Sequence, residues 1–260
     1  MKSQPKVSVL FRLHALHEFY ESSLNSLLDG SYQEIEILIL NTSGSEVPIQ
    51  FSSNPRIRII SIPTTNKLGK ILNIGIKESS GTYIAIMDSD DLATTNRFDI
   101  QVNRMQQNME LGFTSSEALI IGTQSMGKLK VNSFLYPVRN NEELWQALLY
   151  RNPIVHSTVM FRKSAIINSK LYYSGELEVG EDFEFWTRLV GKLKYAGIAE
   201  VLVEYRVHGE QTVNIKKSAL RRQVNYVRLK FAIYTSVKKA HLRATAASSI
   251  KHCVKSILFG

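Results

Sequence analysis

The chain has little cysteine and no long apolar run. Its 260 residues include one cysteine, Cys253, which excludes an internal disulfide and any site built from several thiolates. No stretch approaches the roughly 20 consecutive apolar residues that a membrane-spanning helix needs. Residues 1–11 also lack the long apolar segment and cleavage site of a signal peptide. We therefore expect a cytoplasmic protein.

Acidic residues are missing from the C-terminal part of the chain. The last acid is Glu210, and residues 211–260 carry eleven Lys and Arg, whereas residues 1–210 hold 21 basic and 23 acidic residues. Apolar residues recur in residues 211–260 at helical spacing, which predicts a basic amphipathic helical extension. The apolar positions are Leu220, Val224, Val227, Phe231, Tyr234, Leu242, Ala246, Ile250, Val254 and Ile257.

The basic extension is compatible with more than one partner. Its charged face suits an anionic membrane surface, which attracts each Lys or Arg by roughly 1 kcal/mol. Its apolar stripe suits packing against the preceding domain or against a second copy of the chain. Nucleic acid is not expected, because Tyr226, Phe231 and Tyr234 fall at core spacing rather than forming a stacking platform.

The first 125 residues alternate apolar runs of strand length with helical stretches. This alternation predicts an α/β fold with a mostly parallel sheet that is buried on both faces and flanked by helices. The expected strands are Val7–Phe11, Ile35–Leu40, Ile57–Ile60, Tyr83–Met87 and Ala118–Ile121, and the expected helices are Glu18–Leu28 and Leu68–Lys77.

The pattern changes after about residue 122. We expect a hairpin over Lys128–Tyr136, a helix led by Asn141, a strand over Val159–Arg162 and a helix from about Asp182. A pair of strands follows at Tyr195–Ile198 and Val201–Tyr205. We therefore divide the domain 1–210 into halves 1–122 and 123–210, followed by the extension 211–260.

Acidic residues crowd at the end of one predicted strand. Ligands of open parallel sheets bind beyond the carboxyl ends of the strands, and Asp88, Asp90 and Asp91 directly follow the run Tyr83–Met87. Crowded carboxylates repel one another unless a hard cation such as Mg²⁺ or Mn²⁺, with a diphosphate beyond it, neutralises them. An Asp that caps the next helix is the alternative, but it accounts for one acid better than for three.

Polar residues that could belong to a site also occur in three later segments, at the start of a predicted helix, within an apolar run and at the end of the last strand. Glu181 and Asp182 begin a helix, where the dipole stabilises an ionised carboxylate and so suits a general base, although helix capping is equally compatible. His156 interrupts an apolar run, and a lone His of this kind is more often buried than a ligand. Arg206 and His208 end the last strand, where they suit phosphate and metal binding or simply a solvated strand end.

Taken together, these motifs resemble glycosyltransferase family 2. The resemblance rests on Asn66-x-Leu68, Asn73-Ile-Gly75, the Tyr83–Asp91 segment with its Asp-Ser-Asp triplet, Asn96-Arg97-Phe98, Asn152-Pro153, Glu181-Asp182 and Tyr205-Arg206-x-His208. It covers about residues 5–210 and implies a GT-A fold and inverting transfer from a nucleotide-sugar donor.

The resemblance also implies a role for each matching residue. Asp90 and His208 are the expected ligands of a Mn²⁺ or Mg²⁺ ion, and Asp182 is the expected catalytic base. The expected acceptor-binding residues are His156, Glu181 and Trp186. The expected donor-binding residues are Asp88 and Ser89 of the triplet, together with Asn66, Lys70 and three residues at positions where the chain departs from the family's pattern, Arg12, His14 and Asn41.

Two segments depart from the family's pattern. The first strand is followed by Arg12-Leu13-His14-Ala15 where members usually have Pro-Val-Tyr-Asn, which adds positive charge where the donor is expected. The second strand is followed by Asn41-Thr42-Ser43-Gly44 where members usually have Asp-Asp-Gly-Ser. An amide both donates and accepts hydrogen bonds, so Asn41 remains compatible with uracil.

The resemblance makes an enzyme the first hypothesis. We expect it to move a sugar, with UDP as the carrier, to a hydroxyl of a saccharide or lipid-linked acceptor in the synthesis of a cell-surface polysaccharide. A degenerate sugar-nucleotide binding protein is the alternative, although such a protein needs no base. A phosphatase with an Asp-x-Asp motif fits poorly, because four strands precede the motif and Leu92 stands two residues after Asp90. Because such acceptors are often lipid-linked, contact with the cytoplasmic face of a membrane ranks slightly ahead of simple packing for the extension.

Overall fold

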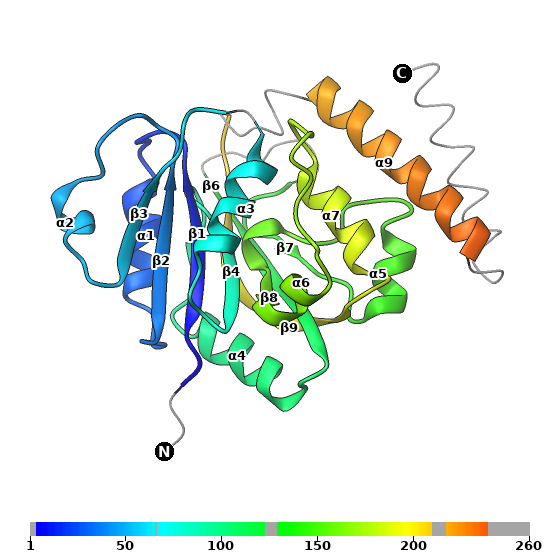
Figure 1. The fold of residues 1–260 in the computed structure, drawn as a ribbon, viewed down its shortest axis with the longest axis horizontal. Helices are drawn as coiled ribbons and strands as arrows, with labels where there is room; N and C mark the ends of the chain where they lie inside the picture. Colours follow the sequence, from blue (N-terminus) through cyan, green and yellow to red (C-terminus); the bar gives the residue numbers. More distant parts are fainter. Residues whose placement is uncertain (1–3, 66, 123–128, 210–216, 239–260) are drawn as a thin grey trace.

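A computed structural model of the chain describes residues 4–65, 67–122, 129–209 and 217–238. One curled, mostly parallel sheet runs through the molecule in the order β3-β2-β1-β4-β8-β6-β9-β5, and β7 pairs with β6. Helices flank the sheet on both faces (Figure 1). This arrangement confirms the predicted fold class.

The N-terminal half forms the regular parallel part of the sheet. Its strands lie in the order β3-β2-β1-β4, and the helices between them follow the predicted alternation. The elements are β1 (Val7–Leu13), α1 (Tyr20–Leu28), β2 (Ile35–Asn41), α2 (Ile49–Ser52), β3 (Ile57–Ser61), α3 (Leu68–Glu78), β4 (Tyr83–Asp88), β5 (Leu92–Ala93) and α4 (Arg97–Gln107).

The second half extends the sheet with both parallel and antiparallel pairs. Its elements are β6 (Leu111–Gly122), β7 (Phe134–Leu135), α5 (Asn141–Ala147), the 3-10 helix η1 (His156–Thr158), β8 (Met160–Arg162), α6 (Lys163–Asn168), α7 (Glu181–Leu189), β9 (Lys194–Val207) and α9 (Lys217–Lys238). The predicted hairpin over Lys128–Tyr136 is not formed as expected: within the described part of that range only Phe134–Leu135 is a strand, and it pairs antiparallel with Ala118 and Leu119 of β6. Lys128 itself lies outside the described residues.

The predicted pair of strands near residue 200 is wrong, because β9 is one continuous strand of 14 residues. It pairs in parallel with β6, and the register shifts on either side of Glu117, where Val201 stands opposite Glu117 and Ile198 opposite Ser116. Three residues of β9, Ala199, Glu200 and Leu202, therefore have no partner in β6, and an irregularity in the ladder accommodates them without a turn.

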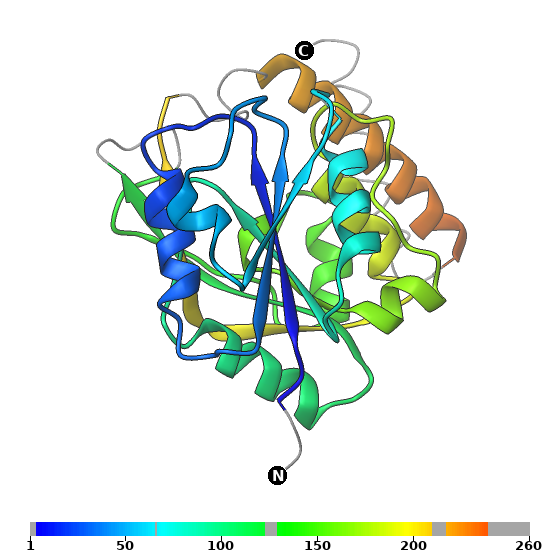
Figure 2. The same ribbon diagram turned by 60° about the vertical axis from the view of Figure 1, so that its left-hand side comes forward.

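The central strands bury alternate residues in two different layers. Leu10, Leu38 and Ile84 belong to a core covered by α3, α5, α6, α7 and α9, while Val9 and Ile37 belong to a core covered by α1, α2 and α4. Figures 1 and 2 show these two groups of helices on opposite faces of the sheet. This period of two is what a strand buried on both faces requires.

Helix α3 of the first half is docked closely on residues 172–175 of the second. The Asn73 side chain accepts a hydrogen bond from Tyr173 N and donates one to Tyr173 O, both at 2.9 Å. A Cβ atom at Gly69 would stand 2.1 Å from the carbonyl oxygen of Ser174, so only glycine permits this approach. The two halves therefore meet through backbone as well as side chains.

Helix α9 packs on α5 and α7 with its apolar face. Phe231 lies against the Trp145 ring, with 5.2 Å between ring centroids, and the buried Arg228 guanidinium lies 5.8 Å from the Phe183 ring centroid. Arg221, Arg222 and Lys230 are exposed. The apolar stripe of the extension thus packs against the domain as far as α9 is described, and the predicted positions from Leu242 onward lie outside the described residues. Within the described part of the chain, none of the helices combines the length and apolarity needed to cross a bilayer.

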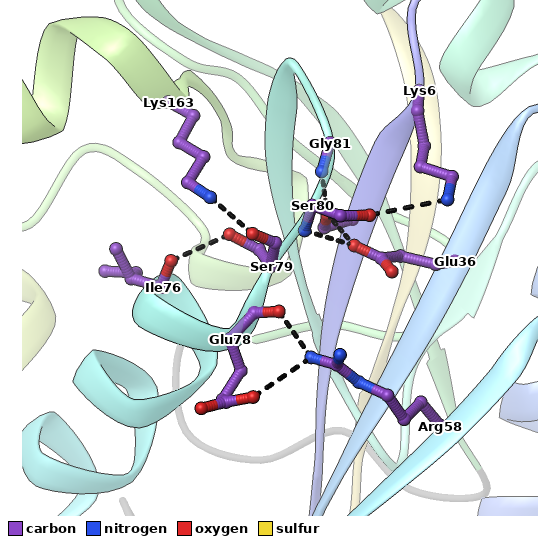
Figure 3. A network of polar contacts seen from close by, with 10 residues as sticks. Lys6, Glu36, Arg58, Ile76, Glu78, Ser79, Ser80, Gly81 and Lys163 are labelled. Atoms are coloured by element: carbon purple, nitrogen blue, oxygen red, sulfur yellow. Dashed lines mark hydrogen bonds and ion pairs between the residues drawn. The ribbon is translucent and has the colours of Figure 1, made fainter.

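A polar network closes the sheet at the amino ends of β1 and β4 (Figure 3). Glu36 accepts hydrogen bonds from Ser8 Oγ and from Ser80 N, and Lys6 Nζ donates to Ser80 Oγ at 3.3 Å. Burial alone would raise the pKa of Glu36, but hydrogen bonds from Ser8 and Ser80 and the charge of Lys6 outweigh it and lower that pKa. The partners of this carboxylate thus stabilise its ionised form.

Candidate functional site

The acidic cluster stands at the carboxyl end of β4, as the strand pattern predicted. Ser157 in η1 donates from Oγ to Asp88 Oδ2 at 3.0 Å and accepts from Asp88 N at 3.2 Å. Arg12, at the end of β1, is the sheet neighbour of Asp88. The first acid of the cluster is therefore held by two hydrogen bonds to Ser157 and lies next to a guanidinium.

His208 reaches the second acid from the end of β9. His208 Nε2 lies 2.9 Å from Asp90 Oδ2, although the two residues are 118 positions apart in the sequence. Arg206 Nε donates to Asp90 O at 2.8 Å, and the Arg206 guanidinium lies 4.4 Å from the centroid of the Phe19 ring. The structure therefore brings together the two residues that were predicted to ligate a metal.

The third acid has a different role, because Asp91 is fully buried. Its Oδ1 accepts a hydrogen bond from Arg206 N at 2.8 Å. Burial, together with the negative charges of Asp90 and Asp88, raises the pKa of Asp91 well above its ordinary value. Asp91 thus anchors β9 to the cluster. Of the three acids, Asp88 and Asp90 line the cavity described below, and Asp91 does not.

Glu181 and Asp182 occupy the first turn of α7 but differ in environment. Gly180 precedes them with φ 71°, a left-handed conformation that favours glycine. Asp182 is half-buried, and its Oδ2 accepts a hydrogen bond from Asn152 Nδ2 at 2.7 Å. Glu181 is 7% exposed, and burial followed by the charge of Asp182 raises its pKa to about 8. The first turn of α7 therefore holds Asp182, which is hydrogen-bonded to Asn152, next to Glu181, whose environment favours the protonated form.

His156 lies at the start of η1 with its ring held on two sides. His156 Nε2 lies 2.9 Å from Tyr173 Oη, and the edge of the Trp186 ring packs against it with 5.8 Å between centroids. Trp186 itself is fully buried and stacks on Phe113 and Phe161. The expectation that Trp186 contacts an acceptor is not supported, because its ring has no exposed surface. The ring packs against His156 instead.

The loop after β1 contributes cationic side chains to the same place. Burial lowers the pKa of Arg12, against the raising effect of Asp88, Glu181 and Asp90, and its Nε is buried without a hydrogen-bond partner. Burial, followed by the charge of Arg12, lowers the pKa of His14. The departure Arg12-Leu13-His14 from the family's pattern therefore puts a guanidinium among three carboxylates.

His17 is a site residue that the sequence interpretation missed. Its Nδ1 accepts a hydrogen bond from Phe19 N at 3.2 Å, so Nε2 carries the proton and donates to Ser89 Oγ at 2.8 Å. This contact ties the β1–α1 loop to the Asp-Ser-Asp triplet. The signal available in the sequence was a second His three positions after His14.

One cavity of about 950 Å³ joins most of these groups. The predicted residues among its lining are Arg12, His14, Asp88, Ser89, Asp90, His156, Glu181, Asp182 and His208. Leu220 and Val224 of α9 also line it, so the extension forms part of one wall. Residues from separate segments of both halves therefore meet around a single space.

Two predicted donor residues lie outside this cavity. Asn41 lines a neighbouring cavity of about 720 Å³, and its amide is engaged by its own loop, with Ser43 N donating to Oδ1 and Nδ2 donating to Ser45 O. Lys70 is exposed on the first turn of α3, next to Gly175. Asn66 lies outside the described residues.

Asp90 and His208 supply two donors for a divalent ion. Among the described residues, no group of three His, Cys, Asp or Glu side chains is arranged to hold a metal, either here or elsewhere. Mg²⁺ and Mn²⁺ sites that act on nucleotides commonly take one or two protein ligands and complete their shell with phosphate and water. The oxygen and imidazole donors present here therefore fit an ion that is shared with a diphosphate.

Comparisons with known proteins identify the family of the chain. The family model of glycosyl transferase family 2 matches residues 12–168. The chain is 27% identical to the O-antigen biosynthesis glycosyltransferase WbnJ of Escherichia coli over 82% of its own length and 83% of that protein.

Two solved structures share the fold of the chain. TarS of S. aureus in complex with UDP superposes with a TM-score of 0.69, at 14% identity, over 96% of this chain and 71% of that one. The mannosyltransferase PcManGT of Pyrobaculum calidifontis in complex with GDP-Man and Mn²⁺ gives a TM-score of 0.63, at 12% identity, over 98% and 74% of the two chains. The fold is thus that of the GT-A glycosyltransferases.

Proposed function

The chain belongs to glycosyl transferase family 2, and from this premise we propose that it transfers a sugar from a UDP-sugar to a hydroxyl of a saccharide or lipid-linked acceptor with inversion at the anomeric carbon. The observation that carries the proposal is the shared cavity, in which Asp182 faces the same space as Asp90 and His208. Inverting transfer needs a base for the acceptor and positive charge for the leaving diphosphate, and the cavity holds separate groups for each.

Asp182 is the proposed base. Asn152 occupies its Oδ2 and fixes the orientation of the carboxylate, which leaves Oδ1 to take the proton from the acceptor hydroxyl. The carboxylate stands at the start of α7, where the helix dipole and free N–H groups favour negative charge. The proposed base is therefore a carboxylate that is fixed by one hydrogen bond and lines the cavity.

Asp90 and His208 are the proposed ligands of a Mn²⁺ or Mg²⁺ ion. Such an ion, when bound, supplies positive charge that stabilises the departing diphosphate. Arg12 and His14 add positive charge on the same side of the cavity, and Asp88 and Ser89 face the donor. The UDP complex of TarS and the Mn²⁺ complex of PcManGT support this choice of nucleotide and ion.

A thermal-shift panel combined with a turnover assay tests the proposal. We expect UDP and one UDP-sugar to raise the melting temperature, more strongly with Mn²⁺ than without it, because a ligand that binds the folded state stabilises it. We also expect release of UDP from that sugar nucleotide when an acceptor is present. Shifts without turnover would instead identify a sugar-nucleotide binding protein, and the absence of any nucleotide shift would refute both.

We further propose that the enzyme works in polysaccharide synthesis at the cytoplasmic face of a membrane. The role of WbnJ in O-antigen biosynthesis supports the pathway, and the exposed Arg221, Arg222 and Lys230 of α9 support contact with anionic lipid. Replacement of these three residues by Gln should weaken binding to vesicles of phosphatidylglycerol and phosphatidylcholine in a sedimentation assay. Binding equal to that of the wild type would rule out α9 as the contact.

A further inference from the structure

Two exposed aromatic side chains lie at the wall of the cavity formed by β7. Phe134 is 46% exposed and Tyr136 is 58% exposed, and both line the cavity. Because they are two positions apart in an extended segment, they point to the same face, and their ring centroids are 6.1 Å apart. Aromatic rings that stay exposed next to each other in a cavity wall are typical of a ligand site.

The aromatic pair is anchored to the sheet that also carries the catalytic groups. Phe134 pairs with Leu119 of β6, and three residues before Leu119 the same strand contributes Ser116 to the cavity lining. Arg151 and Asn152 also line the cavity, and Asn152 binds the proposed base Asp182. The cavity thus combines an apolar platform on β7 with hydrogen-bonding groups next to the base.

This combination matches the chemistry of a sugar ring. A pyranose has an apolar C–H face, which gains free energy when an aromatic ring removes it from water, and a rim of hydroxyl groups that need hydrogen-bond partners. The donor is expected on the side of β1 and β4, where Arg12, Asp88 and Asp90 lie. The ring that meets the β7 platform is therefore expected to come from the acceptor.

We propose that Phe134 and Tyr136 form an acceptor subsite that stacks on the terminal sugar ring of a saccharide acceptor and delivers its hydroxyl to Asp182. The proposal rests on the function proposed above. It assigns the acceptor to the carbohydrates and gives the β7 segment a role in selecting it.

Saturation-transfer NMR with simple glycosides tests the subsite. The probes are the methyl glycosides of glucose, galactose, mannose and N-acetylglucosamine, each added to the protein with UDP and Mn²⁺. We expect at least one glycoside to receive saturation mainly on the protons of one ring face. The double variant Phe134→Ala and Tyr136→Ala should bind it about tenfold more weakly, in line with the loss of aromatic stacking.

Two control variants separate the subsite from general effects. Tyr136→Phe keeps the ring and should retain the signal. Tyr150→Ala removes a ring that is 50% exposed but does not line the cavity, and should leave binding unchanged. The UDP-induced thermal shift of each variant shows that it is folded and that its nucleotide site is intact.

The possible outcomes distinguish this proposal from the proposed function. If UDP binds but no glycoside receives saturation, or the double variant receives as much as the wild type, the subsite is refuted while the donor assignment stands. If the uracil protons of UDP lose saturation in the double variant, the platform binds the nucleobase and the subsite is again refuted. If glycosides bind through Phe134 and Tyr136 but neither UDP nor any UDP-sugar binds, the subsite stands and the proposed function fails.

Discussion

The two ends of the parallel strands β1 and β4 are built on opposite principles. At the amino ends, Glu36 has partners in Ser8, Ser80 and Lys6, and its pKa is lowered (Figure 3). At the carboxyl ends, carboxylates crowd against one another around Arg12, and the pKa of Glu181 is raised to about 8. The contacts at the amino ends stabilise the ionised carboxylate of Glu36, whereas burial and like charges at the carboxyl ends destabilise the ionised carboxylate of Glu181.

This difference supports the proposal that the carboxyl ends of the strands hold the reactive site. A buried charge without matched partners costs free energy, so a fold retains it where a ligand or reaction uses it. The proposal therefore assigns stability to one end of these strands and binding to the other. Substitutions at the two ends should have correspondingly different effects, of which the largest comes first.

Asp182→Asn should cause the largest loss. An amide cannot take the acceptor proton, so transfer should fall by roughly a thousandfold, within the usual range for a general base. Steady-state rates with a UDP-sugar and an acceptor measure this effect, and the UDP-induced thermal shift should stay unchanged. Asp29→Asn, at the exposed end of α1, is the matched control. Full activity of Asp182→Asn would show that the base is another residue.

Asp90→Asn should produce the next largest effect. It weakens one of the two ligands proposed for the divalent ion, so transfer should fall by about a hundredfold. The melting temperature with UDP should then no longer respond to Mn²⁺, and the chelator EDTA should bring the wild type to the same state. An unchanged response to Mn²⁺ in the variant would place the ion elsewhere.

Glu181→Gln should alter the pH dependence of stability. Because the folded pKa of Glu181 is raised, the unfolded chain releases this proton from about pH 4.5 while the folded chain keeps it to about pH 8. Glu181 therefore lowers the free energy of unfolding as pH rises between these values, by on the order of 1 kcal/mol per pH unit. The variant has no carboxyl group at this position, so its free energy of unfolding should rise relative to that of the wild type between pH 5 and pH 8. Urea titrations at several pH values measure this difference. Parallel pH profiles would contradict the raised pKa.

Glu36→Gln should give a smaller effect of opposite sign. The lowered folded pKa of Glu36 contributes stability that is present above its unfolded pKa of about 4.5 and is lost as pH falls through the folded value. The variant should therefore be less stable than the wild type at pH 7, by less than about 1 kcal/mol because the side chain is partly screened by solvent. The two urea midpoints should converge in acid. A difference that grew as pH fell would overturn the comparison of the two ends.

The sequence predicted the parts of the fold where burial and periodicity agree. Strands β1, β2 and β4 are almost entirely buried, whereas the edge strand β3 is partly exposed. The rule that ligands bind at carboxyl ends pointed to Asp88, Asp90, Asp182 and His208, which line one cavity. The apolar pattern predicted only Ala118–Ile121 of β6. The earlier part of the strand was missed because Thr114, Ser115 and Ser116 are polar, although they are buried.

Other features depend on tertiary contacts that no local pattern shows. Trp186 follows the acidic pair Glu181-Asp182 in the sequence, but the stack with Phe113 and Phe161 encloses it. Asn41 stands at a strand end, but its amide bonds to its own loop. His17 joins the site only because the β1–α1 loop folds back onto Ser89.

The seam between α3 and residues 172–175 sets a condition for building chimaeras of this enzyme. Asn73 holds the backbone of Tyr173, and the hydroxyl of Tyr173 holds His156, so a residue of the first half orients a residue of the second. A graft that exchanges residues 123–210 for those of a relative must therefore bring a segment whose backbone fits against Gly69 and Asn73 as residues 172–175 do. Each half thus limits which versions of the other half it can accept.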